Sequence, residues 1–290
     1  MSVACFGSAS IFARFAYEGG INLVTMLTVR FAISAVLLFL AAKVTRSSLT
    51  LSLPDLKTVV LLGAVGYVAM AFLYFGSLQY IPVSTASLIT YTYPTFVTIL
   101  AFFLLKEPLD NLKIITLIMA TAGCALMVWA PGIHINMTGA ALAFGSAITY
   151  SFYLIITSQH VGHLPPRTLT FYISLSAFVV YFVYGLLTRS FLLNLPYQAW
   201  TATAALAAVP TVLGNVFFFS GLRLLGATKT ALFSTAEPFY VVLLAVILFQ
   251  EKFTLIQAGG GLLIVFAVLL LQVGTPIMIK RSKPVKKTAT

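Results

Sequence analysis

The sequence is poor in charged residues, and above all in acidic ones. Charged residues make up 8% of the 290, and six of them are Asp or Glu. A soluble globular domain carries roughly 25% charged residues. The composition therefore excludes a soluble protein. The connections between apolar segments are also too short to hold a separate folded domain.

Cysteine and histidine are scarce as well. Cys5 and Cys124 both lie in apolar segments, which indicates buried thiols without a disulfide framework. His160 and His163 have a loose metal-like spacing, but no Cys, Asp or third His is near them, which favours a solvated loop. Phosphate-binding loops, nucleophile elbows and paired intramembrane carboxylates are absent from the sequence. We therefore expect no enzyme, no metal and no cofactor.

Long apolar runs dominate what is present: 60% of residues are hydrophobic and the mean hydropathy is +1.04. Breaks at Pro, Gly and charge divide the chain into ten segments, at 2–17, 22–42, 58–78, 82–105, 112–130, 137–158, 168–188, 199–222, 227–249 and 254–273. The later segments are near the ~20 residues of a spanning helix and lack the alternation of barrel strands. The first is short, as though the true start lay upstream. The pattern predicts an all-α polytopic membrane protein with ten transmembrane helices.

Basic residues orient this bundle. The loops after the even-numbered segments and the tail hold Lys43, Arg46, Lys57, Lys106, Lys113, Arg167, Arg223, Lys229, Lys280, Arg281, Lys283, Lys286 and Lys287, against Arg14, Arg189 and Lys252 on the other side. This asymmetry predicts an inner-membrane protein with both termini in the cytoplasm. The net charge of +11 is then a topology signal and not a nucleic-acid site. We expect the basic tail, 275–290, to lie against membrane lipid.

The two halves of the chain repeat each other. A shift of 144 residues superimposes Pro94 on Pro238 and Glu107 on Glu251, and a shift of 138 superimposes Phe6-Gly-Ser-Ala on Phe144-Gly-Ser-Ala. Each copy holds five segments, an odd number, so the second copy enters the membrane from the opposite side. We expect two inverted five-helix repeats, at 1–133 and 134–274, with a substrate site near the midplane between them.

These residues resemble those of a known family. The Phe-Gly-Ser opening of each half, the pairs Arg30-Phe31 and Glu237-Pro238, and the exits at Glu107 and Glu251 are similar to those of EamA-type members of the drug/metabolite transporter superfamily. The resemblance covers nearly the whole chain. It implies a ten-helix carrier for amino acids, related metabolites or drugs, commonly moving them outward.

Glu237 is the candidate functional carboxylate, because it lies near the middle of the ninth segment. A charge there costs about 3 kcal/mol or more, so such a residue is a functional hypothesis by default. Glu237 would bind a substrate amine or a coupling proton, or would pair structurally with an arginine. Arg30, about eight residues into the second segment, is its partner in either case. Pro238 opens the helix backbone beside it. We expect Glu107 and Glu251 to be solvated, although they could also hold their loops.

The repeat extends the candidate site to the first half, where Tyr93 replaces Glu237, Thr90 replaces Ser234 and Pro94 matches Pro238. Other polar and aromatic residues share helix faces at helical spacing. These further candidates are Tyr67, Met70 and Tyr74 on the third segment, Ser146, Tyr150 and Tyr153 on the sixth, and Thr211, Asn215 and Phe218 on the eighth. Each one alone is more often packing than ligand contact. Together they predict an asymmetric cavity.

Such a cavity suits a small amphiphile. Tyrosine faces accept apolar or cationic groups, and Glu237 and Arg30 would take an ammonium and a carboxylate. We therefore expect a secondary transporter exporting amino acids or related metabolites by alternating access, either proton-coupled or facilitative. The alternatives are a carrier of a vitamin, a nucleoside derivative or a cationic drug, and then a lipid-moving or channel-like protein. Gly259–Gly261 permits close helix approach, within a monomer or in a homodimer.

Overall fold

The computed structural model describes residues 2–105, 111–128, 135–160, 164–215, 217, 237–252 and 254–274. Within these ranges the chain forms helices joined by short connections and contains no strand. The elements are α1 (Ser2–Glu18), α2 (Leu23–Val44), α3 (Leu53–Leu61), η1 (Leu62–Tyr67), α4 (Val68–Ser77), α5 (Val83–Thr90), α6 (Tyr93–Leu105), α7 (Asn111–Val128), α8 (Met137–His160), α9 (Pro166–Leu187), α10 (Tyr197–Leu206), η2 (Ala207–Gly214), α12 (Glu237–Phe249) and α13 (Leu255–Gly274). The predicted all-α fold is confirmed.

Five of the described stretches are long and apolar enough to cross a membrane: Leu23–Val44, Leu53–Ser77, Val83–Leu104, Met137–Thr157 and Pro166–Leu187. Three shorter ones, Asn111–Leu126, Glu237–Phe249 and Leu255–Leu270, are equally apolar. Consecutive elements such as α3, η1 and α4 form one span, so the helices group into the ten segments that the sequence predicted.

Side chains at the helix ends explain several boundaries. Asn22 accepts a hydrogen bond from the backbone N–H of Thr25 at 2.9 Å and so begins α2. Ser52 accepts from the N–H of Asp55 at 3.3 Å and donates to its carboxylate at 2.6 Å, which begins α3. Asn136 accepts from the N–H groups of Thr138 and Gly139 at the start of α8. Each cap satisfies donors that a helix otherwise leaves without partners.

Helix boundaries in the two halves are in register. α3 and α10 begin 144 residues apart, as do α6 and α12, and also α7 and α13. The π-helical segments η1 and η2 lie at matching places in the third and eighth spans. The second half therefore repeats the first element by element.

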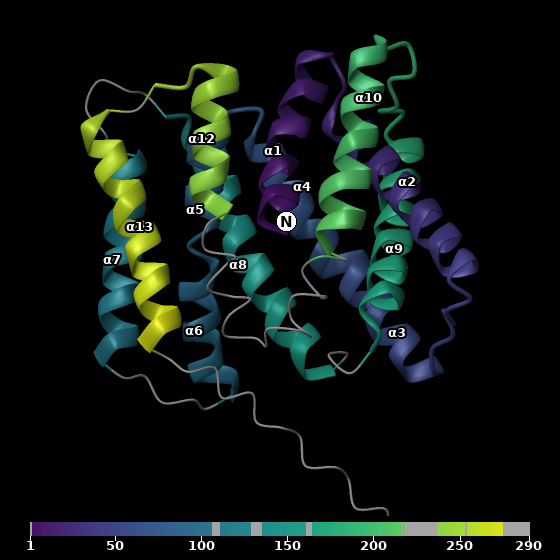
Figure 1. Ribbon diagram of the computed structural model, residues 1–290, viewed down its shortest axis with the longest axis horizontal. Helices are drawn as coiled ribbons and strands as arrows, with labels where there is room; N and C mark the ends of the chain where they lie inside the picture. Colours follow the sequence, from purple (N-terminus) through teal and green to yellow (C-terminus); the bar gives the residue numbers. More distant parts are fainter. Residues whose placement is uncertain are drawn as a thin grey trace, which may run out of the picture.

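Contacts between the halves show that the repeats are inverted. η1 packs on α8 as η2 packs on α1, and α6 packs on α8 as α12 packs on α1. Asn22 at the start of α2 donates to the carbonyl of Ser190, just after the end of α9, at 2.6 Å. α2 and α9 are repeat counterparts, so they lie side by side and antiparallel. Figure 1 shows α7 and α13 at one side of the bundle and α2 and α9 at the other.

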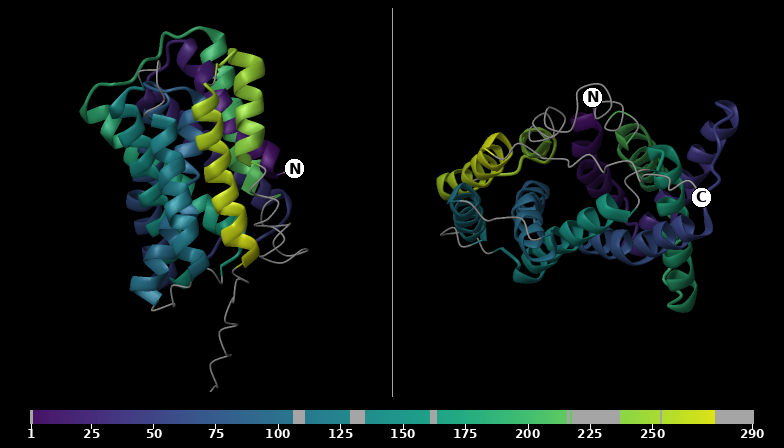
Figure 2. Two further views of the ribbon diagram at one scale, coloured as in Figure 1. Left: turned by 90° about the vertical axis from the view of Figure 1, so that its left-hand side faces the viewer. Right: turned by 90° about the horizontal axis from the view of Figure 1, so that it is seen from below.

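The bundle buries many small residues and exposes many large apolar ones. Ala13, Ala16, Ala143 and Ala177 have no exposed surface, whereas Leu255 is 93% exposed. Lipid tails are as apolar as leucine, so helices in a membrane associate through close packing of small residues. The long helices run roughly parallel to one another (Figure 2), with their apolar flanks available to lipid.

Candidate solute-binding site

Arg30 is buried in the middle of the bundle, with 5% of its surface exposed. Its Nε donates to Thr211 Oγ1 at 3.0 Å, and the guanidinium lies over the rings of Phe75, at 4.6 Å, and Phe31, at 5.1 Å. Nη1 is buried and makes no hydrogen bond to any residue that the structure describes. A buried charged donor without an acceptor is costly, which makes this group the strongest anion-binding candidate in the bundle.

The partner of Arg30 is oriented by a proline. In an α-helix the carbonyl of Leu206 would accept from the N–H of residue 210, but Pro210 has none. In this π-helix the hydroxyl of Thr211, five residues after Leu206, also donates to this carbonyl, at 3.2 Å. The Thr211 oxygen is then turned to accept from Arg30. The π-helix around Pro210 thus positions the guanidinium.

The two π-helices flank the same region. In the repeat register Tyr67, the last residue of η1, corresponds to Thr211 in η2. Tyr67 meets Phe31, next to Arg30, edge-on at 5.7 Å between ring centroids. π-helical turns occur frequently at functional sites. Both halves therefore contribute an irregular turn to the surroundings of Arg30.

A chain of aromatic rings runs from this region toward the other half of the site. Ring centroids of successive members lie 4.8 to 6.2 Å apart, in the order Phe31, Tyr67, Tyr153, Tyr150, Tyr93 and Tyr91. Tyr181 stacks on Phe31 at 5.9 Å and donates its hydroxyl proton to the carbonyl of Val68 at 2.7 Å. Edge-to-face and offset contacts of this kind hold rings firmly. The predicted residues Tyr67, Tyr93 and Tyr150 are thus brought together.

Glu237 lies at the far end of this aromatic chain. It is the first residue of α12 and is close enough to Tyr91, Tyr93 and Tyr150 for its charge to act on their hydroxyls. Tyr74 lies within electrostatic reach of both Glu237 and Arg30. The two charged residues form no ion pair with each other. Among the described residues the ion pair is Arg14 with Glu18, near the end of α1.

The fourth span is broken beside the site. α5 ends at Thr90 and α6 begins at Tyr93, so the helix is interrupted immediately before Pro94. Thr90 donates to the carbonyl of Ala143 at 3.3 Å, and Ser151 donates to that of Tyr93 at 2.9 Å. Both bonds tie the break to α8. Pro238 is the second residue of α12 and is buried.

Other predicted residues are not brought to the aromatic chain or cannot be placed. The Asn215 side chain donates to the carbonyl of Thr211 on its own helix, at 2.5 Å. Phe218 and Ser234 lie outside the described residues, as do Glu107 and His163. The prediction of solvation is wrong for Glu251, whose carboxylate accepts from the N–H groups of Val83 and Ser84, at 2.7 and 3.2 Å, and from the Ser84 hydroxyl.

The structure also adds residues that the sequence reasoning left out. Phe75 and Tyr181 surround Arg30, and Thr211, predicted only as part of a helix face, is its hydrogen-bond partner. A signal for Tyr181 was present, because Ser174, Ala177 and Tyr181 recur at helical spacing, and all three are buried. Phe75 follows Tyr74 directly and had no comparable signal.

An all-helical bundle of two inverted repeats, with broken helices around a buried charge, defines a polytopic membrane transporter. The chain belongs to the EamA-like transporter family, which matches residues 1–129 and 137–273. The family resemblance inferred from the sequence is confirmed, and the protein is a transporter and not an enzyme.

The chain is similar to several uncharacterized transporters. One from Synechocystis sp. is 27% identical over 215 residues, which cover 72% of this chain and 65% of that protein, just under two thirds. One from Archaeoglobus fulgidus is 26% identical and covers 93% of each chain. A crystal structure of a protein 20% identical matches with a TM-score of 0.65, covering 94% of this chain and 96% of that one. This likeness shows the shared fold.

Proposed function

We propose that this transporter is a secondary carrier for small amphipathic solutes with a carboxylate, in particular amino acids, moved outward by alternating access. The observation that carries the proposal is Arg30, which is buried and, among the residues that the structure describes, has no hydrogen-bond partner for Nη1 and no carboxylate partner. A solute carboxylate would accept a charge-assisted hydrogen bond from that donor.

The rest of the site matches the remainder of such a solute. The tyrosine rings between Arg30 and Glu237 offer apolar faces, and Glu237 offers a negative charge for an ammonium group. Because the two charges do not pair with each other, both remain available to a zwitterion. The proposed site residues are therefore Arg30, Glu237, Tyr67, Tyr74, Thr90, Tyr93, Tyr150, Asn215, Phe218 and Ser234, with Pro94 and Pro238 as helix breaks.

Counterflow in proteoliposomes tests this proposal. Three solutes share one ring: phenylalanine, phenethylamine, which lacks the carboxylate, and 3-phenylpropionate, which lacks the amine. A carrier gives saturable exchange, and we expect phenylalanine to exchange at the lowest half-saturating concentration. A hydrogen bond to a charged group contributes about 1.5–3 kcal/mol, so loss of one end should weaken binding roughly ten- to a hundred-fold.

Two variants assign the ends of the solute. Arg30→Gln should weaken the binding of phenylalanine and 3-phenylpropionate and leave that of phenethylamine unchanged. Glu237→Gln should weaken the binding of phenylalanine and phenethylamine and leave that of 3-phenylpropionate unchanged. Asp55→Asn, on the exposed first turn of α3, removes a charge outside the site and should leave the binding of all three solutes unchanged. If both variants weakened all three solutes equally, Arg30 and Glu237 would be structural.

The same assay separates the other functions considered. Absence of exchange with any amino acid would move the search to vitamins, nucleoside derivatives and cationic drugs. Flux without saturation or counterflow would support a channel-like protein, and lipid movement without solute flux would support a lipid-moving one. If Glu237→Gln kept exchange but lost proton-driven accumulation, Glu237 would be the coupling site.

We also propose an inner-membrane location with both termini in the cytoplasm and repeats at 1–133 and 134–274. The basic loop residues Lys43, Arg46 and Lys57 support this orientation. Labelling of single cysteines from either side of the membrane tests it, because Lys57→Cys should react only from the cytoplasmic side. The protein would function as a monomer or a homodimer within membrane lipid.

A further inference from the structure

A pocket lies at the rim of the bundle, and its lining includes none of the residues around Arg30. It has a volume of about 300 Å³ and is lined by residues of α1, of the loop between α4 and α5, and of the end of α12. These include Arg14, Gln79, Tyr80, Phe249 and Glu251. The volume is that of a small-molecule site. Tyr80 and Phe249 supply aromatic walls, and Arg14 and Glu251 supply the charges.

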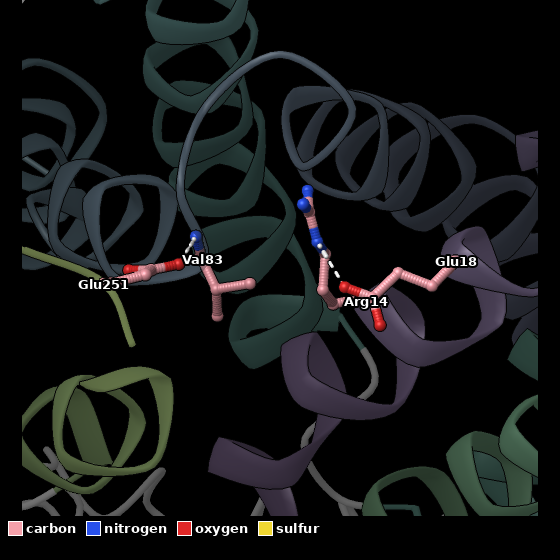
Figure 3. Close-up of polar contacts among 4 residues, drawn as sticks. All are labelled: Arg14, Glu18, Val83 and Glu251. Carbon is pink, nitrogen blue, oxygen red and sulfur yellow. Dashed lines mark hydrogen bonds and ion pairs between the residues drawn. The ribbon is translucent and has the colours of Figure 1, made fainter. Parts of the chain in front are cut away.

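Glu251 and Arg14 differ in whether they have hydrogen-bonding groups without a partner among the described residues. The Glu251 carboxylate is occupied by the N–H groups of Val83 and Ser84 at the start of α5 and by the Ser84 hydroxyl. Arg14 uses Nε on Glu18, at 3.3 Å, and its terminal nitrogens make no hydrogen bond to a described residue. Figure 3 shows the end of the Arg14 guanidinium turned toward the loop that leads into Val83, with Glu251 reaching that loop from the other side.

The pocket therefore presents donors but no free acceptor charge. The Glu251 carboxylate keeps its charge, but neutral donors at the α5 terminus, where a carboxylate is favoured, hold its oxygens. The guanidinium edge of Arg14 remains for a ligand, and its side chain is 41% exposed, so a solute can reach it from the aqueous phase. This combination fits the carboxylate end of a small solute whose apolar part lies on the aromatic walls.

We propose that this pocket is a second solute site, at the rim, that binds small aromatic or apolar carboxylates through Arg14. The proposal rests on the proposed function for the choice of solute, but it uses none of the residues of the central site. Glu251 holds the far wall in place by bonding to α5. A solute would occupy the rim site as it leaves or approaches the bundle.

Protection of a single cysteine tests the rim site without any transport measurement. In a background with Cys5→Ala and Cys124→Ala, Gln79→Cys places a thiol on the exposed wall of the pocket. Its reaction with a membrane-impermeant maleimide is followed with phenylalanine, 3-phenylpropionate or phenethylamine present. At about twice its Kd a competing ligand slows the reaction about threefold. We expect phenylalanine and 3-phenylpropionate to slow the reaction in this way, and phenethylamine to leave its rate unchanged.

Matched variants decide where the protecting ligand sits. Arg14→Gln should abolish protection, Glu18→Gln should preserve it, and Arg30→Gln should preserve it because the central site is not involved. Thr188→Cys, an exposed position at the end of α9, should show no protection. Protection that survived Arg14→Gln but disappeared with Arg30→Gln would overturn the proposal, since the effect would then come from central binding.

The two proposals fail separately. Arg14-dependent protection without any solute exchange in proteoliposomes would leave the rim site in place and remove the proposed function. Saturable exchange with no protection of Gln79→Cys by any carboxylate would remove the rim site and leave the proposed function. Absence of both protection and exchange would overturn the rim site and the proposed function together.

Discussion

Arg46 and Arg189 occupy the same left-handed turn in the two halves of the protein, with φ of 49° and 51°. Each lies between a threonine and a serine, and each turn ends a repeat-related helix, α2 or α9. Thr45 and Thr188 both donate to the carbonyl four residues earlier at 2.8 Å. The sequence Thr-Arg-Ser recurs at these places and marks the inverted repeat more sharply than any single apolar match.

Glycine at either arginine should stabilise the protein. A left-handed backbone costs a side-chain-bearing residue about 1–2 kcal/mol, and glycine avoids that cost at some expense in unfolded-state entropy. We expect Arg46→Gly and Arg189→Gly each to raise the free energy of unfolding by about 0.5 kcal/mol. Thermal unfolding in detergent measures this. Lys43→Gly, inside the last turn of α2, should instead lower the free energy of unfolding by about 1 kcal/mol. If all three glycine variants lowered the free energy of unfolding, the prediction would be contradicted.

Close packing of α7 against α13 should make Gly123 intolerant of a side chain. A Cβ at this position would lie 2.7 Å from the carbonyl oxygen of Gly260, whereas one at Gly259 would meet nothing within 4 Å. We expect Gly123→Ala to destabilise the protein by about 1–3 kcal/mol through overpacking, and Gly259→Ala to stabilise it by up to about 1 kcal/mol through helix propensity. Unfolding midpoints in detergent compare the two, and equal effects would mean that the helices can separate freely there.

Loss of the Glu251 carboxylate should loosen the start of α5. Glu251→Ala removes the acceptor of two backbone N–H groups and of the Ser84 hydroxyl. We expect a loss of about 1–2 kcal/mol in the free energy of unfolding, as for other helix caps. Hydrogen exchange should also quicken at the first amides of α5. The neighbouring Lys252 is exposed, so Lys252→Ala should change neither the free energy of unfolding nor hydrogen exchange at α5. Unchanged exchange in Glu251→Ala would show that another group caps α5.

The hydroxyl of Thr211 should contribute more to the free energy of unfolding than the shape of the side chain does. Thr211→Val removes the hydroxyl's bond to the Leu206 carbonyl and leaves Arg30 Nε without its partner, which we expect to cost about 1–3 kcal/mol. Thr211→Ser keeps both bonds and should stay within about 1 kcal/mol of the parent. Unfolding in detergent separates the variants. A valine variant as stable as the serine variant would mean that water replaces the hydroxyl.

Most of the fold follows from the sequence because a membrane leaves few choices. The predicted segment 22–42 became α2, and 82–105 became α5 and α6. The third span was predicted to begin at residue 58 but begins at Leu53. The difference has a physical cause: Asp55 and Lys57 are charged, so a count of apolar residues excludes them, although Ser52 and Asp55 form a favourable helix start.

The site follows from the sequence only in part. Helical spacing placed Tyr67 and Tyr74 on one face and Tyr150 and Tyr153 on another, and the structure joins these faces through ring contacts. The spacing could not show that Thr211 would meet Arg30, 181 residues earlier in the chain, because that contact depends on how the helices pack. The π-helix around Pro210 was equally hidden. The roles of these residues in binding stay predictions.

The unpaired burial of Arg30 has an electrical consequence. The Arg30 guanidinium forms no ion pair with a described carboxylate. A membrane potential acts on a charge within the membrane with about 2.3 kcal/mol per 100 mV when that charge crosses the whole field. An anionic group bound at Arg30 would cancel that charge. With Glu237 ionised, the empty site has no net charge. The return of the empty protein would therefore respond to voltage only when Glu237 is protonated, and in that state the movement of Arg30 together with a bound carboxylate would not.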